Sequence, residues 1–243
     1  GDLIHSMWLD VKFASQSAGL LAALRHSNWT NNTGHAFVKQ CEIEIGGQLI
    51  DRHYSQWLDI WNELSDHDES EWIGLNKHTA KEAYLHKVRR GINQAQQLYI
   101  PLQFWFCRNP GLALPLIALQ YHEVKLKLTT RGMFSLINSN HVTLATAVAP
   151  TSCNLWVDYI YLDTDERRRF AQVSHEYLIE QVQRVSGAMS TSKKLNFNHP
   201  VKELIWVVQG DTVATENNSA LSTSTDIDAT KNTTSAFADK NDY

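Results

Sequence analysis

Apolar residues recur at every second position along much of this 243-residue chain. The clearest stretch is 123–128 (EVKLKL), in which aliphatic and charged side chains alternate. Because successive side chains of a strand point to opposite faces, such a stretch predicts a strand with one face in a core. Further predicted strands lie at 7–13, 40–45, 48–51, 100–106, 155–162, 177–183 and 201–208. Many strands with little helix favour an antiparallel β-sandwich or barrel.

Some of these stretches carry extra information. Gly46 and Gly47 separate two strands and tolerate positive φ, which predicts a hairpin turn. Both faces of 155–162 are largely apolar, so we expect that strand to be covered on both sides. A short helix is predicted at 55–64, where Trp57, Leu58, Trp61 and Leu64 form one stripe. Residues 66–90 are polar and predict a long loop.

The composition changes after residue 209. Residues 210–243 are rich in Ser, Thr, Asn and Asp, and such a stretch buries too little apolar surface to offset its ordering entropy. The strand predicted just before it, at 201–208, would therefore begin a second domain. Gly1 is not an initiator Met, which suggests a start inside a longer protein.

Enzyme motifs are missing from the sequence. It has no G-x-S-x-G, no P-loop and no G-x-G-x-x-G, and His175-Glu176 does not continue to H-E-x-x-H because position 179 is Ile. Cys41, Cys107 and Cys153 form no C-x-x-C pair and are expected to be buried hydrophobes. We predict no catalytic, cofactor-binding or metal-binding residues.

Several blocks resemble, in the same order, the major capsid proteins of nucleocytoplasmic large DNA viruses. The most distinctive is 157–172 (VDYIYLDTDERRRFAQ), followed by 175–183 (HEYLIEQVQ). The other blocks are 1–4 (GDLI), 43–51 (IEIGGQLID) with the helix after it, 99–106 (YIPLQFWF) with 109–111 and 114–116, and 199–209 (HPVKELIWVVQ). Iridovirus-like, phycodnavirus-like and mimivirus-like branches all fit.

The resemblance implies an all-β fold, the N-terminal jelly-roll sandwich of a double jelly-roll capsid protein, with short helices in its loops. Residues 1–195 would form the first jelly roll without its earliest strands. Residues 196–243 would begin the second, with its first strand at about 201–208 and a polar loop at 210–243. The protein would be a structural molecule and not an enzyme, with no cofactor.

The implied partners are two further copies in a homotrimer, neighbouring capsomers of an icosahedral capsid, and minor capsid proteins. The virion would assemble in the host cytoplasm. A net charge of −4 provides no basic field for nucleic acid, so direct contact with the genome is not expected. The protein could lie near an internal viral membrane, but its longest apolar run, 111–120, is too short for insertion.

The charged block at 163–170 is the main candidate site. It contains Asp163, Asp165, Glu166, Arg167, Arg168, Arg169 and Phe170. We expect a turn whose polar network fixes the connection between two strands, in preference to a contact with a neighbouring subunit. Three carboxylates could bind a hard cation, but the spacing and the glycine of a calcium loop are absent and three arginines follow.

Two other functions compete with a capsid protein. Eight tryptophans on a β-sandwich would suit a carbohydrate-binding module if their rings were exposed, although their strand and helix patterns favour packing inside the protein. A cupin-like metal-dependent oxygenase would need histidines and carboxylates gathered inside a barrel.

Overall fold

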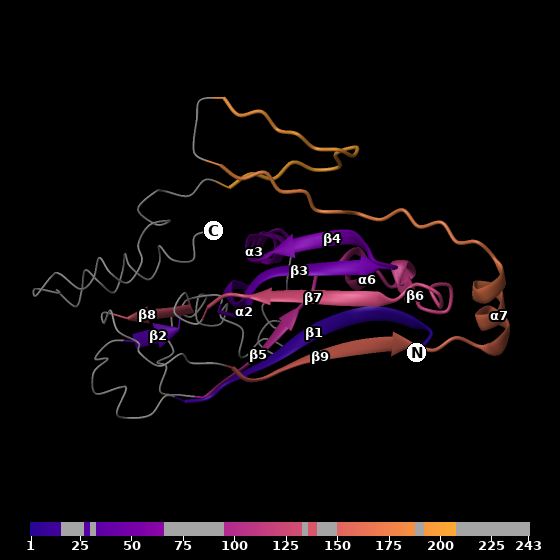
Figure 1. Ribbon diagram of the computed structural model, residues 1–243, viewed down its shortest axis with the longest axis horizontal. Coiled ribbons are helices and arrows are strands. Elements are labelled where there is room, and N and C mark those ends of the chain that lie inside the picture. The colour runs from indigo at the N-terminus through magenta and orange to yellow at the C-terminus, as the bar shows by residue number, and fades with distance from the viewer. Residues whose placement is uncertain are drawn as a thin grey trace, which may run out of the picture.

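The alternating stretches fold into antiparallel strands, as the computed structural model in Figure 1 shows. The structure describes residues 1–15, 27–29, 33–65, 95–132, 136–139, 150–187 and 192–207. The predicted loop at 66–90 and the polar segment 210–243 lie entirely outside the described residues.

The first sheet is built around β1 (Leu3–Phe13). Strand β5 (Gln96–Pro101) pairs with its second half on one side, and β6 (Leu114–Pro115) pairs with its start. Strand β9 (Pro150–Ile160) pairs along almost the whole of β1. Every pairing in this sheet is antiparallel.

The second sheet has the order β4-β3-β7. It contains β3 (Val38–Ile45), β4 (Gln48–Tyr54) and β7 (Val124–Thr130), again antiparallel. A small separate pair joins β2 (Ser27–Trp29) to β8 (Ile137–Ser139).

The helices are short and connect strands. They are α2 (Thr33–Phe37), α3 (Ser55–Leu64), α6 (Trp105–Arg108), the 3₁₀ turn η1 (Pro110–Leu112) and α7 (Thr164–Gln172). The helix predicted at 55–64 is confirmed as α3, with Leu58 almost fully buried.

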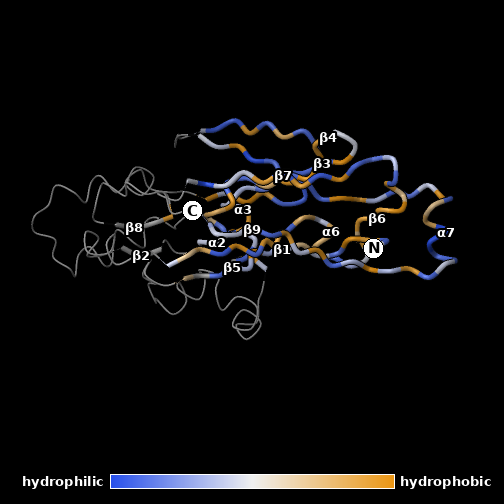
Figure 2. The backbone as a smooth tube through the Cα atoms, turned by 60° about the horizontal axis from the view of Figure 1, so that its bottom comes forward, coloured by the Kyte–Doolittle hydropathy of each residue, from blue (hydrophilic) through white to orange (hydrophobic). Residues whose placement is uncertain are grey.

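The core lies between the two sheets, and period-two alternation places its side chains there. Val11 of β1, Ile43 of β3 and Ile100 of β5 belong to one buried cluster that spans both layers. Figure 2 shows the apolar positions recurring along these strands. Two antiparallel sheets that share one core form a β-sandwich, so the predicted fold class is confirmed.

The strand predicted at 100–106 is only partly correct. Strand β5 ends at Pro101, and α6 begins at Trp105. Phe104 and Phe106 are nonetheless fully buried and stacked, with ring centroids 5.8 Å apart. The apolar spacing therefore identified the buried side chains correctly, but it did not reveal that the backbone changes conformation after the proline.

The prediction that β9 is covered on both sides is wrong. Leu155 and Trp156, on opposite faces of the strand, expose 42% and 61% of their surfaces. Strand β9 pairs with β1 along one side only, so it is an edge strand among the described elements. Alternation tells which residues share a face, but not whether another layer lies over that face.

Two further predicted strands are not found. Residues 177–183 and 201–207 are extended but form no strand, and Val208 lies outside the described residues. A strand requires a hydrogen-bonded neighbour, and no hydrogen bond between two backbone groups joins either segment to another described segment. We call residues 173–187 and 192–207 the arm. Figure 1 shows its first part leaving α7 and running over β4.

Candidate interaction surfaces

The hairpin between β3 and β4 is formed by Gly46 and Gly47, as predicted. Their φ angles are +59° and +81°, which L-residues with side chains rarely adopt. Gly46 N–H donates to the Glu123 carbonyl at 2.9 Å, so the hairpin is also bonded to the segment before β7. A Cβ on Gly46 would lie 2.7 Å from His122 Nδ1, whereas one on Gly47 would meet open space.

The charged block is a helix and not the predicted turn. Asp163 precedes α7, and its carboxylate accepts a bond from Thr164 N–H at 2.7 Å. Asp165 and Glu166 occupy the first turn and Arg169 the last, the arrangement that favours the helix dipole. These local signals were present in the sequence and predict a helix start at this position.

Arg167 connects α7 to the beginning of β1. Its Nη2 donates to Asp2 Oδ2 at 2.8 Å, and Leu162 N–H donates to the same oxygen at 2.8 Å. These bonds, first that from Leu162 and then that from Arg167, lower the pKa of Asp2. Asp2 N–H also donates to the Ile160 carbonyl at 3.1 Å, so Asp2 holds the end of β9 and the start of α7 together.

The other residues of the block have more local contacts. Arg168 Nη1 lies 3.7 Å from Asp165 Oδ1 on the exposed side of α7. Phe170 stacks on His175 with ring centroids 4.7 Å apart, and His175 Nε2 lies 3.0 Å from the Phe170 carbonyl. Among the described side-chain bonds of this charged block, the one that reaches a distant segment is that of Arg167 to Asp2, just before β1.

The arm is attached to β4 through Asp51. Its Oδ1 accepts bonds from Arg52 N–H at 2.9 Å and from Val182 N–H of the arm at 3.0 Å. Ile179 packs against the core cluster, and Gln181 donates to the Ile50 carbonyl. The arm therefore contacts β4 through side chains and isolated backbone groups, and not through the continuous hydrogen bonds of a β-ladder.

Asp51 also has a buried histidine beside it. His53 Nε2 lies 2.7 Å from Asp51 Oδ2, with each side chain 1% exposed, although the pair is not aligned as a hydrogen bond. The His53 ring stacks on Phe104 at 4.6 Å between centroids.

Glu180 is the second attachment point of the arm. Its Oε2 lies 3.0 Å from Arg108 Nη2, and its Oε1 accepts a bond from Lys202 on the returning half of the arm. The bond from Lys202 is the largest cause that lowers the pKa of Glu180. The Arg108 guanidinium lies over the Trp61 ring at 4.6 Å. One carboxylate thus joins both halves of the arm to α6.

Large apolar side chains are exposed on two parts of the molecule. On the arm, Leu178, Val201, Leu204 and Trp206 are between 50% and 91% exposed. On the first sheet, Tyr99 and Trp156 are exposed. The sequence pattern predicted that most tryptophan side chains pack inside the protein. That holds for Trp105, at 4% exposure, but not for Trp156 or Trp206.

The described residues contain no cluster of histidine, cysteine and acidic side chains that could hold a metal ion. No described helix is long and apolar enough to cross a membrane.

Burial raises the pKa of the Cys41 and Cys107 thiols to about 12 in each case. Cys153 is exposed, so the expectation that all three cysteines are buried is wrong for that residue.

Comparison with known proteins assigns the family. Residues 1–163 match the family model described as major capsid protein N-terminus. Residues 166–240 match a second model, described as large eukaryotic DNA virus major capsid protein. The chain belongs to this major capsid protein family. The resemblance identified from the sequence blocks is therefore confirmed.

Individual relatives agree with this assignment. The chain is 50% identical over 213 residues to a major capsid protein of Pyramimonas orientalis virus, covering 85% of this chain and 49% of that protein. It is 40% identical over 180 residues to the major capsid protein of Paramecium bursaria Chlorella virus 1, covering 70% of this chain and 39% of that protein. The capsid protein chain described here thus spans about half or less of these relatives.

A solved structure gives the same result for the fold. A quasi-atomic model of the PBCV-1 virus capsid aligns with a TM-score of 0.61 at 34% identity, covering 82% of this chain and 47% of that one. This likeness supports the jelly-roll assignment of the capsid protein chain.

Proposed function

We propose that this chain is part of a major capsid protein subunit that builds the shell of a large icosahedral DNA virus. The observation that carries the proposal is the likeness of its β-sandwich to a subunit of a virus capsid, at 34% identity. Two family models also match it in consecutive order. The subunit acts by presenting rigid complementary surfaces, so that apolar burial between copies drives assembly.

The assembly unit that we propose is a homotrimer. Trimers would pack against neighbouring capsomers and minor capsid proteins in a virion that assembles in the host cytoplasm. Closed three-fold symmetry repeats each subunit contact and leaves no interface unsatisfied. We expect no direct contact with nucleic acid, and a position near an internal viral membrane without insertion.

The domain division remains part of the proposal. Residues 1–195 would belong to the first jelly roll, and 196–243 would begin a second one that continues in the complete protein. The arm supports this division, because Leu204 and Trp206 are exposed apolar residues that a second core could bury.

We also propose that residues 163–170 serve the internal connection of the subunit. Arg167 reaches Asp2 within the same chain, and the capped helix α7 turns the chain from β9 toward the arm. Gly46 and Gly47 have a similar internal role, because they close the β3–β4 hairpin.

Native mass spectrometry of the complete protein tests the proposed assembly. A shell-building subunit is expected to give a species of three times the subunit mass that persists on dilution. A protein that stays monomeric at all concentrations would contradict the proposed function.

A further inference from the structure

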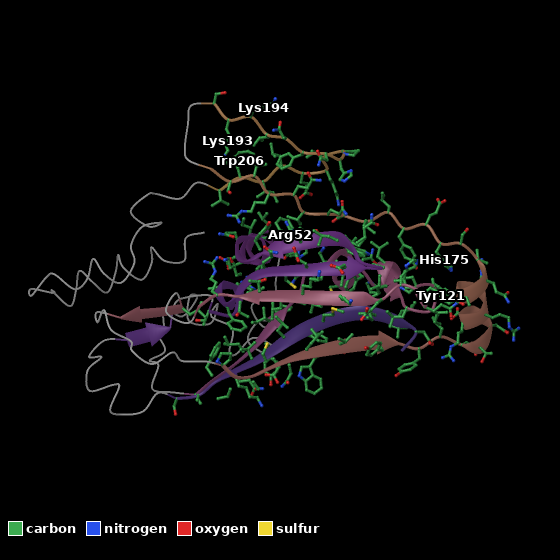
Figure 3. All side chains as sticks on the ribbon, in the orientation of Figure 1. Arg52, Tyr121, His175, Lys193, Lys194 and Trp206 are labelled. Atoms are coloured by element: carbon green, nitrogen blue, oxygen red, sulfur yellow. The ribbon has the colours of Figure 1, made fainter. Side chains whose placement is uncertain are left out.

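The second sheet ends at β4, and the arm lies over that edge. Among the described strands, β4 pairs with β3 and with no other. The free edge of a strand presents unpaired N–H and C=O groups, which a strand of another molecule can use to extend the sheet. Figure 1 shows the first part of the arm passing over β4, and Figure 3 shows Arg52 of β4 beneath the arm. The arm is therefore a candidate cover for this edge.

A bulge in β4 leaves one residue without a partner in the sheet. The register of β4 on β3 shifts between Ile43 and Glu44, so that Ile50 of β4 has no partner on β3. An extra residue of this kind interrupts the ladder and stays unpaired within it. The Gln181 side chain of the arm donates to the Ile50 carbonyl. The arm thus occupies an acceptor that the bulge exposes.

The contacts of the arm continue along β4 in the direction of the strand. Val182 N–H donates to Asp51 Oδ1 at 3.0 Å, one residue further along both segments than the preceding bond. The Arg184 guanidinium then lies 4.9 Å from the centre of the Tyr54 ring, at the last residue of β4. Between residues 181 and 184 the arm therefore follows β4 from the bulge to its end, along the path that an added strand would take.

The Asp51 carboxylate takes the place of a ladder acceptor. In a β-ladder an N–H that faces the neighbouring strand donates to a carbonyl of that strand, whereas Val182 N–H donates to the Asp51 side chain. The same oxygen accepts from Arg52 N–H at 2.9 Å, and the Asp51 side chain is only 1% exposed. A segment that covers an edge without joining the ladder does not extend the sheet, so it offers no new edge on its far side.

A second attachment lies directly beside the first. Glu180 is 3.0 Å from Arg108 Nη2 of α6 and accepts a bond from Lys202 on the returning half of the arm. We propose that the arm is an intramolecular cover, which keeps the β4 edge from pairing with a strand of a second protein molecule. This inference does not rest on the proposed shell-building function, because an open strand edge is a hazard to any β-sandwich.

A pair of double variants of the complete protein tests the cover. Glu180→Gln with Val182→Pro removes one charge of the ion pair and the N–H that Asp51 accepts, because proline has no N–H. The matched control is Glu176→Gln with Val185→Pro. It makes the same changes at arm positions that no described hydrogen bond or ion pair joins to β4.

Hydrogen exchange measures whether the edge becomes accessible. We expect peptide 48–54 of β4 to exchange at least about tenfold faster in the test variant than in the wild type, and at the wild-type rate in the control. Peptide 3–13 of β1, in the other sheet, should keep its protection in both variants. Its protection shows that the sandwich is still folded.

Thioflavin T fluorescence measures whether an accessible edge is used. We expect the test variant to form thioflavin-binding aggregates at protein concentrations at least about tenfold lower than the wild type, and the control to behave as the wild type. Adding Leu49→Lys to the test variant places a charge at a β4 residue that is 44% exposed, and it should suppress this aggregation. Gln181→Ala is a milder second variant, which should shift exchange and aggregation in the same direction by a smaller factor.

Four results would overturn the inference. They are unchanged exchange of β4 in the test variant, faster exchange without aggregation, equal aggregation of the test and control variants, and aggregation that Leu49→Lys does not reduce. If the test variant also loses the protection of β1, Gln181→Ala decides: a protein with wild-type exchange and wild-type aggregation would then overturn the inference.

Discussion

Arg167 and Asp2 lie 165 positions apart in the sequence, yet Arg167 Nη2 donates to Asp2 Oδ2 at 2.8 Å. The same Asp2 oxygen accepts from Leu162 N–H, so one largely buried carboxylate joins the start of β1 to the end of β9 and to α7. A charge-assisted bond to a carboxylate with little access to water is stronger than a surface ion pair. The charged block is therefore bonded to the segment before β1 through the side chain of Arg167.

Replacing Arg167 by Gln is expected to destabilise the complete protein. The substitution leaves the Asp2 carboxylate without its cation, and we expect the melting temperature to fall by a few degrees. Arg168→Gln is the control, because Arg168 is exposed and its nearest acidic oxygen is 3.7 Å away. Differential scanning calorimetry measures both variants. Equal melting temperatures for the two would contradict the assigned role of Arg167.

The attachment of the arm at Glu180 is expected to depend on pH. Its pKa is lowered from 4.5 by bonding to Lys202, so the folded state favours the charged form. The stabilisation of the folded state by ionised Glu180 is therefore fully present above pH 4.5. It is lost as the pH falls through the lower pKa that Glu180 has in the folded state. We expect Glu180→Gln to melt below the wild type at pH 6, with the difference shrinking toward pH 3. The exposed neighbour Glu176, changed to Gln, should show no such trend.

Among the residues that attach the arm to the sandwich, Asp51 is expected to contribute the most to stability. Asp51→Ala removes the acceptor for Val182 N–H and leaves His53 without its buried neighbour. Leaving part-buried N–H donors without their acceptor costs about 1 to 3 kcal/mol in the free energy of unfolding. Gln181→Ala removes only an exposed bond to the Ile50 carbonyl, which water can replace, and should cost far less. Urea denaturation of the two variants measures both losses in the free energy of unfolding. A smaller loss for Asp51→Ala than for Gln181→Ala would be inconsistent with this account.

The two hairpin glycines are expected to differ in their tolerance of a side chain. Gly47→Ala places an L-residue at φ +81° and should cost about 1 kcal/mol in the free energy of unfolding. Gly46→Ala should cost more, because its Cβ would also displace His122. Asn tolerates positive φ, so Gly47→Asn should recover most of the loss. Chemical denaturation of the three variants gives this order, and an unaffected Gly46→Ala protein would refute it.

Alternation in the sequence predicted β1, β3, β4 and β7, because one face of each strand is at least partly buried, whereas the short strand β6 was not predicted. It placed β3, β4 and β7 correctly, and the two-glycine turn fixed the hairpin register. The prediction failed where residues are buried without belonging to a strand, and where a strand with apolar residues has no layer covering it. Phe104 and Phe106 keep the spacing of a strand although the chain turns into α6, and β9 is apolar on both faces although its rings are exposed.

The candidate contacts were harder to predict than the elements. Asp163 before α7 carries a local capping signal, which the sequence interpretation did not use. By contrast, no local pattern links Arg167 to Asp2, Glu180 to Arg108, or Asp51 to Val182. These partners lie far apart in the sequence and meet only because the sheets bring β1, β4 and the arm into place. Such pairs require the three-dimensional fold.

Electron cryo-microscopy of the purified complete protein tests the central claim most directly. If the chain is part of a capsid subunit, the particles are expected to be trimers of hexagonal outline with two β-sandwiches in each subunit, one of them containing β1, β5 and β9. Particles that contain a single copy, or a single sandwich with its edges open, would contradict the account.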